Sequence, residues 1–301
     1  MSEPEPASAS VHKPVLLREV LHAVAPGPGD TVVDGTVGAA GHAAEIARRL
    51  GPDGKLFGFD RDPMMLGFAE TRLADAGDAD FELYHRPYDE IAEALPDAAI
   101  GRIDAALLDL GYSSDQISDD SRGFRFDSEG PFDLRFDTSA AKPAATLLDE
   151  VDVATLTAWL EKYGEIPAAR RLAERIFTAR PITSARHFAE TVAAASSHTA
   201  SPGRHPATQA FQALRIAVND ELGRLERFLS DVAPQILRPG GRLAVISFHS
   251  LEDRIVKSAF RDSGVWTITS PKPITGRPAE VRANPRARSA KLRVATRGGP
   301  D

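Results

Sequence analysis

The chain contains no cysteine among its 301 residues. Disulfide bonds, thiolate zinc sites, cysteine-held iron–sulfur clusters and cysteine nucleophiles are therefore excluded. Long apolar runs are missing too, since no segment approaches the ~20 apolar residues of a membrane-spanning helix. Residues 1–10 are rich in Pro, Ser and acid and lack the apolar stretch of a signal peptide. We expect a disordered leader there, and a cytoplasmic protein.

An excess of positive charge is also lacking, because the formal net charge is −7 at pH 7. Taken alone, that value argues against a nucleic-acid partner. Residues 271–297 depart from the average, with a single acid, Glu280, among many cations. Such a segment is typical of a polyanion-binding surface, and a solvated basic tail is the alternative. An acidic core and a basic tail would also suit head-to-tail contacts in a homodimer. The cations are Lys272, Arg277, Arg282, Arg286, Arg288, Lys291, Arg293 and Arg297.

Short β-branched runs alternate with helical patterns in the first half of the chain. This rhythm is typical of βαβ units around a parallel sheet. Pro63 is a favoured first residue of a helix, and it follows the second of these runs. The expected elements are strands at 31–34, 55–60, 81–85 and 103–109, and helices at 42–50 and from Pro63 onward.

The rhythm stops near residue 116, where a loop rich in Gly, Asp and Phe leads into helical patterns such as 153–163 and 167–178. Three- and four-residue spacing of apolar side chains then predicts one long amphipathic helix over 208–232. A strand at 242–247 follows, then a helix started by a Ser250–Asp253 capping box, and a last strand at 292–296 on the sheet edge. We therefore expect an α/β core with an inserted, mostly helical domain. The expected division is a leader (1–10), a core (11–115 and 205–301) and an insertion (116–204).

Three segments place chemistry at the carboxyl ends of the expected strands, where open α/β sheets bind ligands. The first is the turn Asp34–His42, with Gly at every third position, which favours close backbone approach and negative charge at a helix start. The second is Asp60, an acid placed to accept hydrogen bonds from two ribose hydroxyls. The third is Asp109. A nicotinamide dinucleotide is the alternative ligand, but Val37 occupies the second glycine position of its fingerprint, so a nucleoside without pyrophosphate fits better.

Longer stretches make the chain resemble the RsmH (MraW) family of bacterial methyltransferases. That family methylates N4 of a cytosine in the decoding region of 16S ribosomal RNA, and its fold is a class I, Rossmann-like methyltransferase core with an inserted helical domain. The resemblance covers nearly the whole chain. It rests on HKPVLL (12–17), DGTVGAAGH (34–42), GFDRDP (58–63), LLDLGYSSDQ (107–116), RGFRFDSEGPFDLRFD (122–137), HPATQAFQALRIAVNDEL (205–222), GGRLAVISFHSLEDRIVK (240–257) and NPRARSAKLRV (284–294).

The resemblance implies S-adenosyl-L-methionine as cofactor and a set of residues that contact it. Two of them depart from the family pattern: Ala40 stands where Gly is usual, and Tyr88 where Phe is usual. Ala40 raises the question of whether the backbone needs a positive φ at that position. The implied contacts are Ala40, Gly41, His42, Asp60, Tyr88, Asp109 and Gln116.

The chemistry of a cytosine substrate narrows the catalytic residues. Methylation at C5 needs a cysteine nucleophile, and this chain has no cysteine. The methyl group would therefore go to a heteroatom. The exocyclic amine is a poor nucleophile and needs a hydrogen-bond acceptor that takes its proton. Asp109 is our candidate, with a role as cofactor contact alone as the alternative. Tyr112 would stack on the flipped base, or serve packing.

RNA contacts are expected from a loop that interleaves aromatic and cationic residues, namely Arg122, Phe124, Arg125 and Arg135. The alternative is that its Phe side chains pack under the insertion. His249, beyond a strand end, and Arg286 and Arg288 of the basic segment complete the expected RNA contacts. No metal-ligand spacing stands out. A methyltransferase acting on a protein or small molecule is the alternative function, and the Arg/Phe loop and basic segment weigh against it.

Overall fold

The computed structural model describes residues 10, 13–140, 142–195, 205–262 and 264–298. Apart from Ser10, the predicted leader lies outside them. The described residues pack into two units: the first comprises those up to Gly111 and from Leu222 onward, and the second runs from Tyr112 to Glu221. Within these ranges, no helix is long and apolar enough to cross a membrane.

The first unit is built on a sheet whose described strands follow the order β3-β2-β1-β4-β5-β8-β6, with β7 also paired to β8. The pairs from β3 through β5 are parallel, and β8 runs antiparallel to β5. Strand order therefore reverses between β1 and β4, the point where such sheets bind ligands. The strands are β1 (Thr31–Asp34), β2 (Lys55–Asp60), β3 (Asp80–His85), β4 (Ile103–Asp109), β5 (Leu237–Ser247), β6 (Trp266–Ile268), β7 (Ile274–Thr275) and β8 (Lys291–Arg297).

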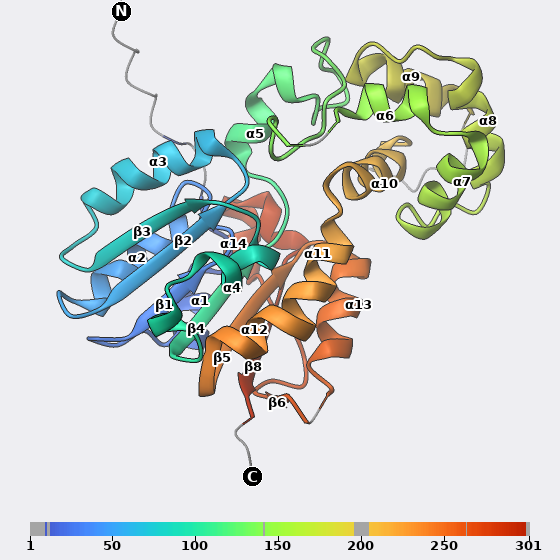
Figure 1. Ribbon diagram of the computed structural model, residues 1–301. Helices are drawn as coiled ribbons and strands as arrows, with labels where there is room; N and C mark the ends of the chain where they lie inside the picture. The colour runs from blue at the N-terminus through green and yellow to red at the C-terminus, as the bar shows by residue number, and fades with distance from the viewer. Residues whose placement is uncertain (1–9, 11–12, 141, 196–204, 263, 299–301) are drawn as a thin grey trace, which may run out of the picture. The chain divides into compact units, whose positions relative to one another are not determined.

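Helices cover both faces of this sheet because alternate strand residues point to opposite sides (Figure 1). Val32 and Leu107 join one core, under the helices α1 (Leu17–Val24), α2 (Gly41–Leu50) and α3 (Pro63–Ala74). Val33 and Leu108 join the other core. Its helices are α4 (Ile91–Ala94), α11 (Glu221–Arg227), α12 (Ala233–Ile236) and α13 (Ser250–Ala259); α14 (Pro278–Ala283) precedes β8.

Two expectations for the C-terminal part are wrong in detail. The last long strand is not at the sheet edge, because β6 and β7 both pair with β8 on the side away from β5. These two strands have three and two residues, too short to show a periodic pattern in the sequence. The predicted box of Ser250 and Asp253 is also displaced, since α13 is capped by His249 with Glu252. Asp253 instead pairs with Lys291 at 3.1 Å and Arg293 at 2.7 Å.

The second unit is helical, as its sequence pattern indicates. Phe132, Phe188 and Phe211 form the centre of its core, with ring centroids 4.6–5.4 Å apart. Asn219 ties the loop to the last helix, since its side chain donates to Leu134 O and accepts from Phe136 N–H. The helices are α5 (Ser114–Ser118), α6 (Ala144–Glu150), α7 (Val153–Lys162), α8 (Ala169–Thr178), α9 (Ala185–Ala195) and α10 (Thr208–Asn219).

The long helix predicted over 208–232 is interrupted. Asp220 adopts a left-handed conformation (φ 50°, ψ 40°) that ends α10. Asp reaches this region more easily than most residues. The chain then continues as α11 and as a π-helical stretch, Phe228–Val232. Apolar spacing persists across the break, so periodicity alone does not reveal it.

Candidate active site

The turn after β1 is shaped by its neighbours in the first unit. A Cβ at Gly35 would lie 2.5 Å from Leu108 Cδ2, so only glycine fits between β1 and β4. Gly38 has φ +51°, a conformation that side chains disfavour. These glycines therefore serve strand packing and turn geometry, which is a more specific role than the ligand approach expected from the sequence.

The backbone conformation of Ala40 shows whether a positive φ is needed where the family pattern has Gly. It is the N-cap of α2 with φ 56° and ψ 34°, so the position does need a positive φ. Alanine there costs ~1–2 kcal/mol relative to a right-handed conformation. The next residue, Gly41, would bring a Cβ to 3.2 Å from Pro14, which explains its lack of a side chain.

Asp60, at the end of β2, organises this turn. Its Oδ2 accepts from Gly38 N–H at 2.8 Å, and its Oδ1 accepts from Asp62 N–H at 2.9 Å. Burial is the largest influence on this carboxyl and raises its pKa to about 6, although the backbone donors oppose that shift. Asp60 thus links β2 to the glycine turn, and its raised pKa of about 6 lies close to neutral pH.

Asp109 ends β4 beside the same turn. Its backbone N–H donates to Thr36 Oγ1 at 2.6 Å, and its Oδ2 lies 3.5 Å from His42 Nε2. The His42 side chain is buried, with 5% exposed, and that of Asp109 is partly buried, with 12% exposed. The first unit therefore brings Asp109, His42 and Asp60 to one end of the sheet, around the strand-order reversal.

Asp34 and Thr36 belong to this site although the sequence assigned them no role. Asp34 is 1% exposed and accepts from Thr36 N–H at 3.1 Å. Burial raises the pKa of Asp34 to about 7; His42 and the Thr36 N–H oppose the shift, and Asp109 and Asp60 add to it. A signal was present, since Asp34 ends a strand directly after two apolar residues, Val32 and Val33. The carboxyls of Asp34 and Asp109 thus both interact with the His42 imidazole.

Tyr88 is held by its own neighbours in the first unit. It is 8% exposed and meets Phe228 edge to face, with ring centroids 5.6 Å apart. The next residue, Asp89, bonds Arg224 at 2.6 Å and Arg227 at 2.9 Å. These charged bonds fix the short helix that carries the ring. The ring of Tyr88 therefore lies in a firmly held segment, and its cofactor contact stays a prediction.

Two predicted site residues, Gln116 and Tyr112, belong to the second unit. Gln116 is 4% exposed and forms a reciprocal capping box with Ser113, at 2.8 and 3.1 Å. Tyr112 stacks on Phe124 at 5.3 Å between centroids, and the Arg215 guanidinium lies 4.8 Å from its ring. Both residues therefore have local structural partners, and their cofactor and base contacts stay predictions.

The loop expected to bind RNA has two kinds of arginine. The Arg122 guanidinium donates to the carbonyls of Arg135 and Phe136, and the residue is 6% exposed. Arg135 pairs with Asp133 through two bonds of 2.7 and 2.8 Å. Arg125, by contrast, is 43% exposed, although it pairs with Asp127. Arg122 and Arg135 hold the loop together, and Arg125 remains accessible.

A pocket of about 650 Å³ opens next to this loop, within the second unit. Phe126 stacks on His205 there, with ring centroids 4.4 Å apart. The wall combines aromatic rings with arginines and two acids. The residues are Tyr112, Ile117, Phe124, Arg125, Phe126, Asp127, Arg186, Ala189, Glu190, Ala193 and His205.

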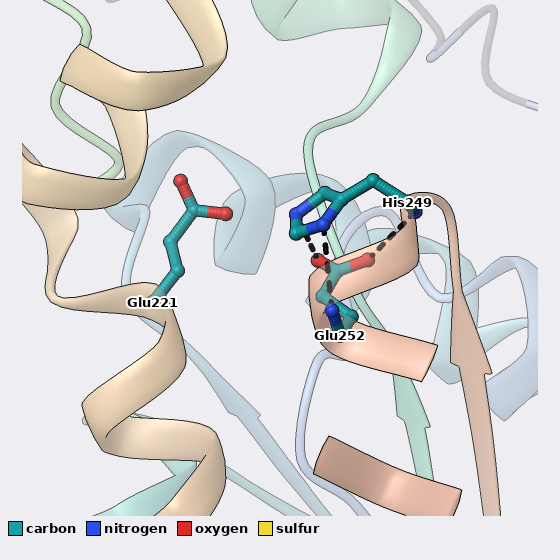
Figure 2. Close-up of side chains that lie close together, drawn as sticks. All are labelled: Glu221, His249 and Glu252. Carbon is teal, nitrogen blue, oxygen red and sulfur yellow. Dashed lines mark hydrogen bonds and ion pairs between the residues drawn. The ribbon is translucent and has the colours of Figure 1, made fainter. Parts of the chain in front are cut away.

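The His249 ring lies against the Glu252 carboxylate at the start of α13 (Figure 2). His249 Nε2 is 3.2 Å from Glu252 Oε1, and Glu252 Oε2 accepts from His249 N–H at 3.2 Å. Glu221, also drawn there, bonds Arg215 of its own unit at 2.8 Å. His249 is thus a helix cap, and its RNA contact stays a prediction.

The basic segment is partly neutralised in the first unit. Lys291 and Arg293 pair with Asp253, and Arg277 lies 3.4 Å from Glu19. The Arg286 guanidinium lies 5.5 Å from the Phe248 ring. Arg288 is exposed, as are Lys272 and Arg282. The segment therefore still presents cations to solvent, which an RNA contact requires.

Comparisons with known proteins match this chain to one protein family. The model of the MraW methylase family matches residues 9–298. A protein named ribosomal RNA small subunit methyltransferase H, from Nitratidesulfovibrio vulgaris (strain Miyazaki F), is 44% identical over 96% of this chain and 86% of its own. Its namesake from Trichlorobacter lovleyi is 43% identical over 96% and 98%.

Solved structures resemble the chain more distantly. A putative rRNA methylase from Clostridium thermocellum aligns with a TM-score of 0.44 and 12% identity, over 97% of this chain and all of its own. The SAM-dependent O-methyltransferase of Thermotoga maritima gives 0.42 and 11%, over 95% and 65%. With nearly the whole chain matched by the family model and by relatives above 40% identity, the protein belongs to the MraW methylase family, and its core is a Rossmann-like methyltransferase fold.

Proposed function

We propose that this protein transfers a methyl group from S-adenosyl-L-methionine to N4 of a cytosine in the decoding region of 16S ribosomal RNA. The coarser part, methylation of small-subunit ribosomal RNA, is supported by the names of its relatives. The observation that carries the proposal is the position of Asp109 and Asp60 at the carboxyl ends of β4 and β2, on either side of the glycine turn of an MraW-family chain.

The residues of the first unit fit the cofactor. Asp60 is an acid at the end of β2, suited to accept from a ribose diol. The start of α2 offers backbone N–H groups and has no acid in its first turn, which suits a carboxylate. His42 carries a buried nitrogen, Nδ1, that has no hydrogen-bond partner among the described residues. S-adenosylmethionine would supply an electrophilic methyl group bound to a sulfonium.

Asp109 performs the protein's own part of the reaction in this proposal. Its carboxylate accepts a hydrogen bond from the amine, which raises the electron density on N4. It then takes the proton that N4 releases as the new C–N bond forms. Burial of Asp109 strengthens this electrostatic effect, because the surroundings screen the charge less than water does. The second unit has, by itself, a pocket lined by aromatic rings and arginines, which suits unpaired bases.

The direct test is methyl transfer from labelled cofactor to small ribosomal subunits that lack native methylation. We expect N4-methylcytidine, identified by mass spectrometry of the nucleosides, and no label in subunits that already carry the modification. Label at another nucleoside would contradict the position. Label-free RNA from an enzyme that binds the cofactor would contradict the substrate, and protein or small-molecule acceptors would then be tried.

Asp60→Asn is expected to weaken cofactor binding by ~10–100-fold, because the charged acceptor for the ribose diol is lost. The same reasoning predicts a pH dependence. The pKa of Asp60 is raised to about 6, so wild-type affinity should fall as the pH drops below that value and the carboxylate becomes protonated. Calorimetry across this range would measure both effects. An Asp60→Asn variant with wild-type affinity, or with the wild-type pH dependence, would assign Asp60 to turn structure alone.

A further inference from the structure

His42 has a position that packing alone does not explain. It is the second residue of α2 and 5% exposed, and its Nε2 lies 3.5 Å from Asp109 Oδ2. That separation is within ion-pair range and longer than a well-formed hydrogen bond. Both ring nitrogens, Nδ1 and Nε2, are buried without a hydrogen-bond partner in the described part of the chain. An unpartnered buried polar atom costs ~1–3 kcal/mol, so an apolar side chain would serve packing better.

The charged and polar groups around His42 belong to three strands, to α2 itself and to α3. Asp34 on β1 and Asp109 on β4 act on the imidazole and on each other, and Asp60 on β2 adds to the negative charge around Asp34. Opposing them is the amino end of α2 itself, which disfavours a cation. Arg72 of α3 is the nearby arginine, and it reaches the Ala39 carbonyl at 3.5 Å. The imidazole at the start of α2 thus interacts with two of these acids, Asp34 and Asp109.

We propose that His42 is a positioning residue for Asp109: its Nε2–H donates to Asp109 Oδ2, which fixes the orientation of the carboxylate and keeps it ionised as the acceptor for the substrate amine. The inference rests on the role proposed for Asp109. This role differs from the cofactor contact predicted for His42. The backbone N–H at the start of α2 can make that contact whatever side chain stands at position 42. Nε2 of the side chain acts on the acid, and the backbone N–H and Nδ1 remain available to the cofactor.

The kinetic test compares His42→Gln and His42→Leu with wild type on small subunits. Glutamine retains a donor, whereas leucine matches the packing and has none. We expect kcat to fall ~10–100-fold in His42→Leu, with partial recovery in His42→Gln and little change in KM. The acid limb of the kcat–pH profile should move to higher pH in His42→Leu, because the Asp109 carboxylate loses a donor that favours its charged form. His22→Gln, which removes an exposed histidine of α1, is the matched control.

A second readout needs no activity. Nitrogen-15 spectra of the imidazoles in the cofactor-free protein, assigned by the signal lost in His42→Gln, report which nitrogen is protonated. We expect the Nε2–H form for His42, with a shift in its signals in Asp109→Asn. His22 signals should stay unchanged.

The outcomes separate this inference from the proposed function. If the His42 signals are identical in wild type and Asp109→Asn, the pair does not interact and the inference is overturned. An unshifted acid limb in an active His42→Leu enzyme overturns it as well. If wild type methylates no RNA but the His42 signals depend on Asp109, the proposed substrate is wrong and the pairing stands.

Discussion

Asp109→Asn is expected to lower kcat for methyl transfer by ~10²–10⁴-fold, the usual contribution of a positioned general base. Asparagine keeps an oxygen that accepts a hydrogen bond from the amine, but it cannot take the proton. Its shape is nearly that of aspartate, and the backbone bond from residue 109 to Thr36 Oγ1 does not involve the side chain. Cofactor affinity should therefore change far less than kcat. Single-turnover assays on small subunits, beside calorimetry with the cofactor, measure the two quantities.

The control for this prediction is Asp53→Asn, which removes the same charge from an exposed turn. It should leave both kcat and cofactor affinity near wild type. Asp109→Ala should lose more activity than Asp109→Asn, because it also removes the acceptor. The alternative role of Asp109, as a cofactor contact alone, makes the opposite prediction. Affinity would then fall in both variants, while kcat at saturating cofactor would stay close to wild type.

The parallel half of the fold could be predicted almost to the residue. β1, β2 and β4 begin and end where their β-branched and apolar runs do, and α3 begins at Pro63. These strands are buried on both faces, so a continuous apolar run defines them in the sequence. The helices α7 and α8 follow their periodic patterns for the same reason, because each buries one apolar face.

What could not be predicted depends on single residues and on distant pairing. The break at Asp220 comes from one left-handed residue inside an unbroken apolar period. Asn219 bonds the loop residues Leu134 and Phe136, more than eighty positions earlier, and no local pattern shows that. β6 and β7 exist because β8 offers an edge.

The site shows the same division. Asp60 and Asp109 could be found because acids end apolar strands. Asp34 also ends a strand, but its raised pKa depends on burial that the sequence does not state. Arg122 is predicted to contact RNA because it stands in an Arg/Phe loop, and that contact stays a prediction. In the structure its guanidinium is used by two carbonyls of that loop. Charge patterning predicts the surface of a segment, but not which of its cations turn inward.

Asp34→Asn is expected to stabilise the cofactor-free protein at about pH 8, by on the order of 4 kcal/mol. The pKa of Asp34 is raised from 3.8 to about 7 in the folded state, so the fold favours the protonated acid. Stability therefore falls as the pH rises from 3.8 to about 7, and above that range the full cost of the buried charge is present. Asparagine keeps the acceptor for Thr36 N–H and carries no charge, so it removes this cost.

Urea unfolding can isolate this effect in the first unit, because the chain has two tryptophans and Trp266 is 3% exposed in the core of that unit. A Trp159→Phe background leaves Trp266 as the reporter, since Trp159 belongs to the second unit. The advantage of Asp34→Asn should shrink by about 1.4 kcal/mol per pH unit below about pH 7, because the wild-type acid then becomes protonated. Asp53→Asn should show no such slope. If Asp34→Asn is destabilising at every pH, the charged form of Asp34 is stabilised by its neighbours, and the site holds the acid ionised for the ligand.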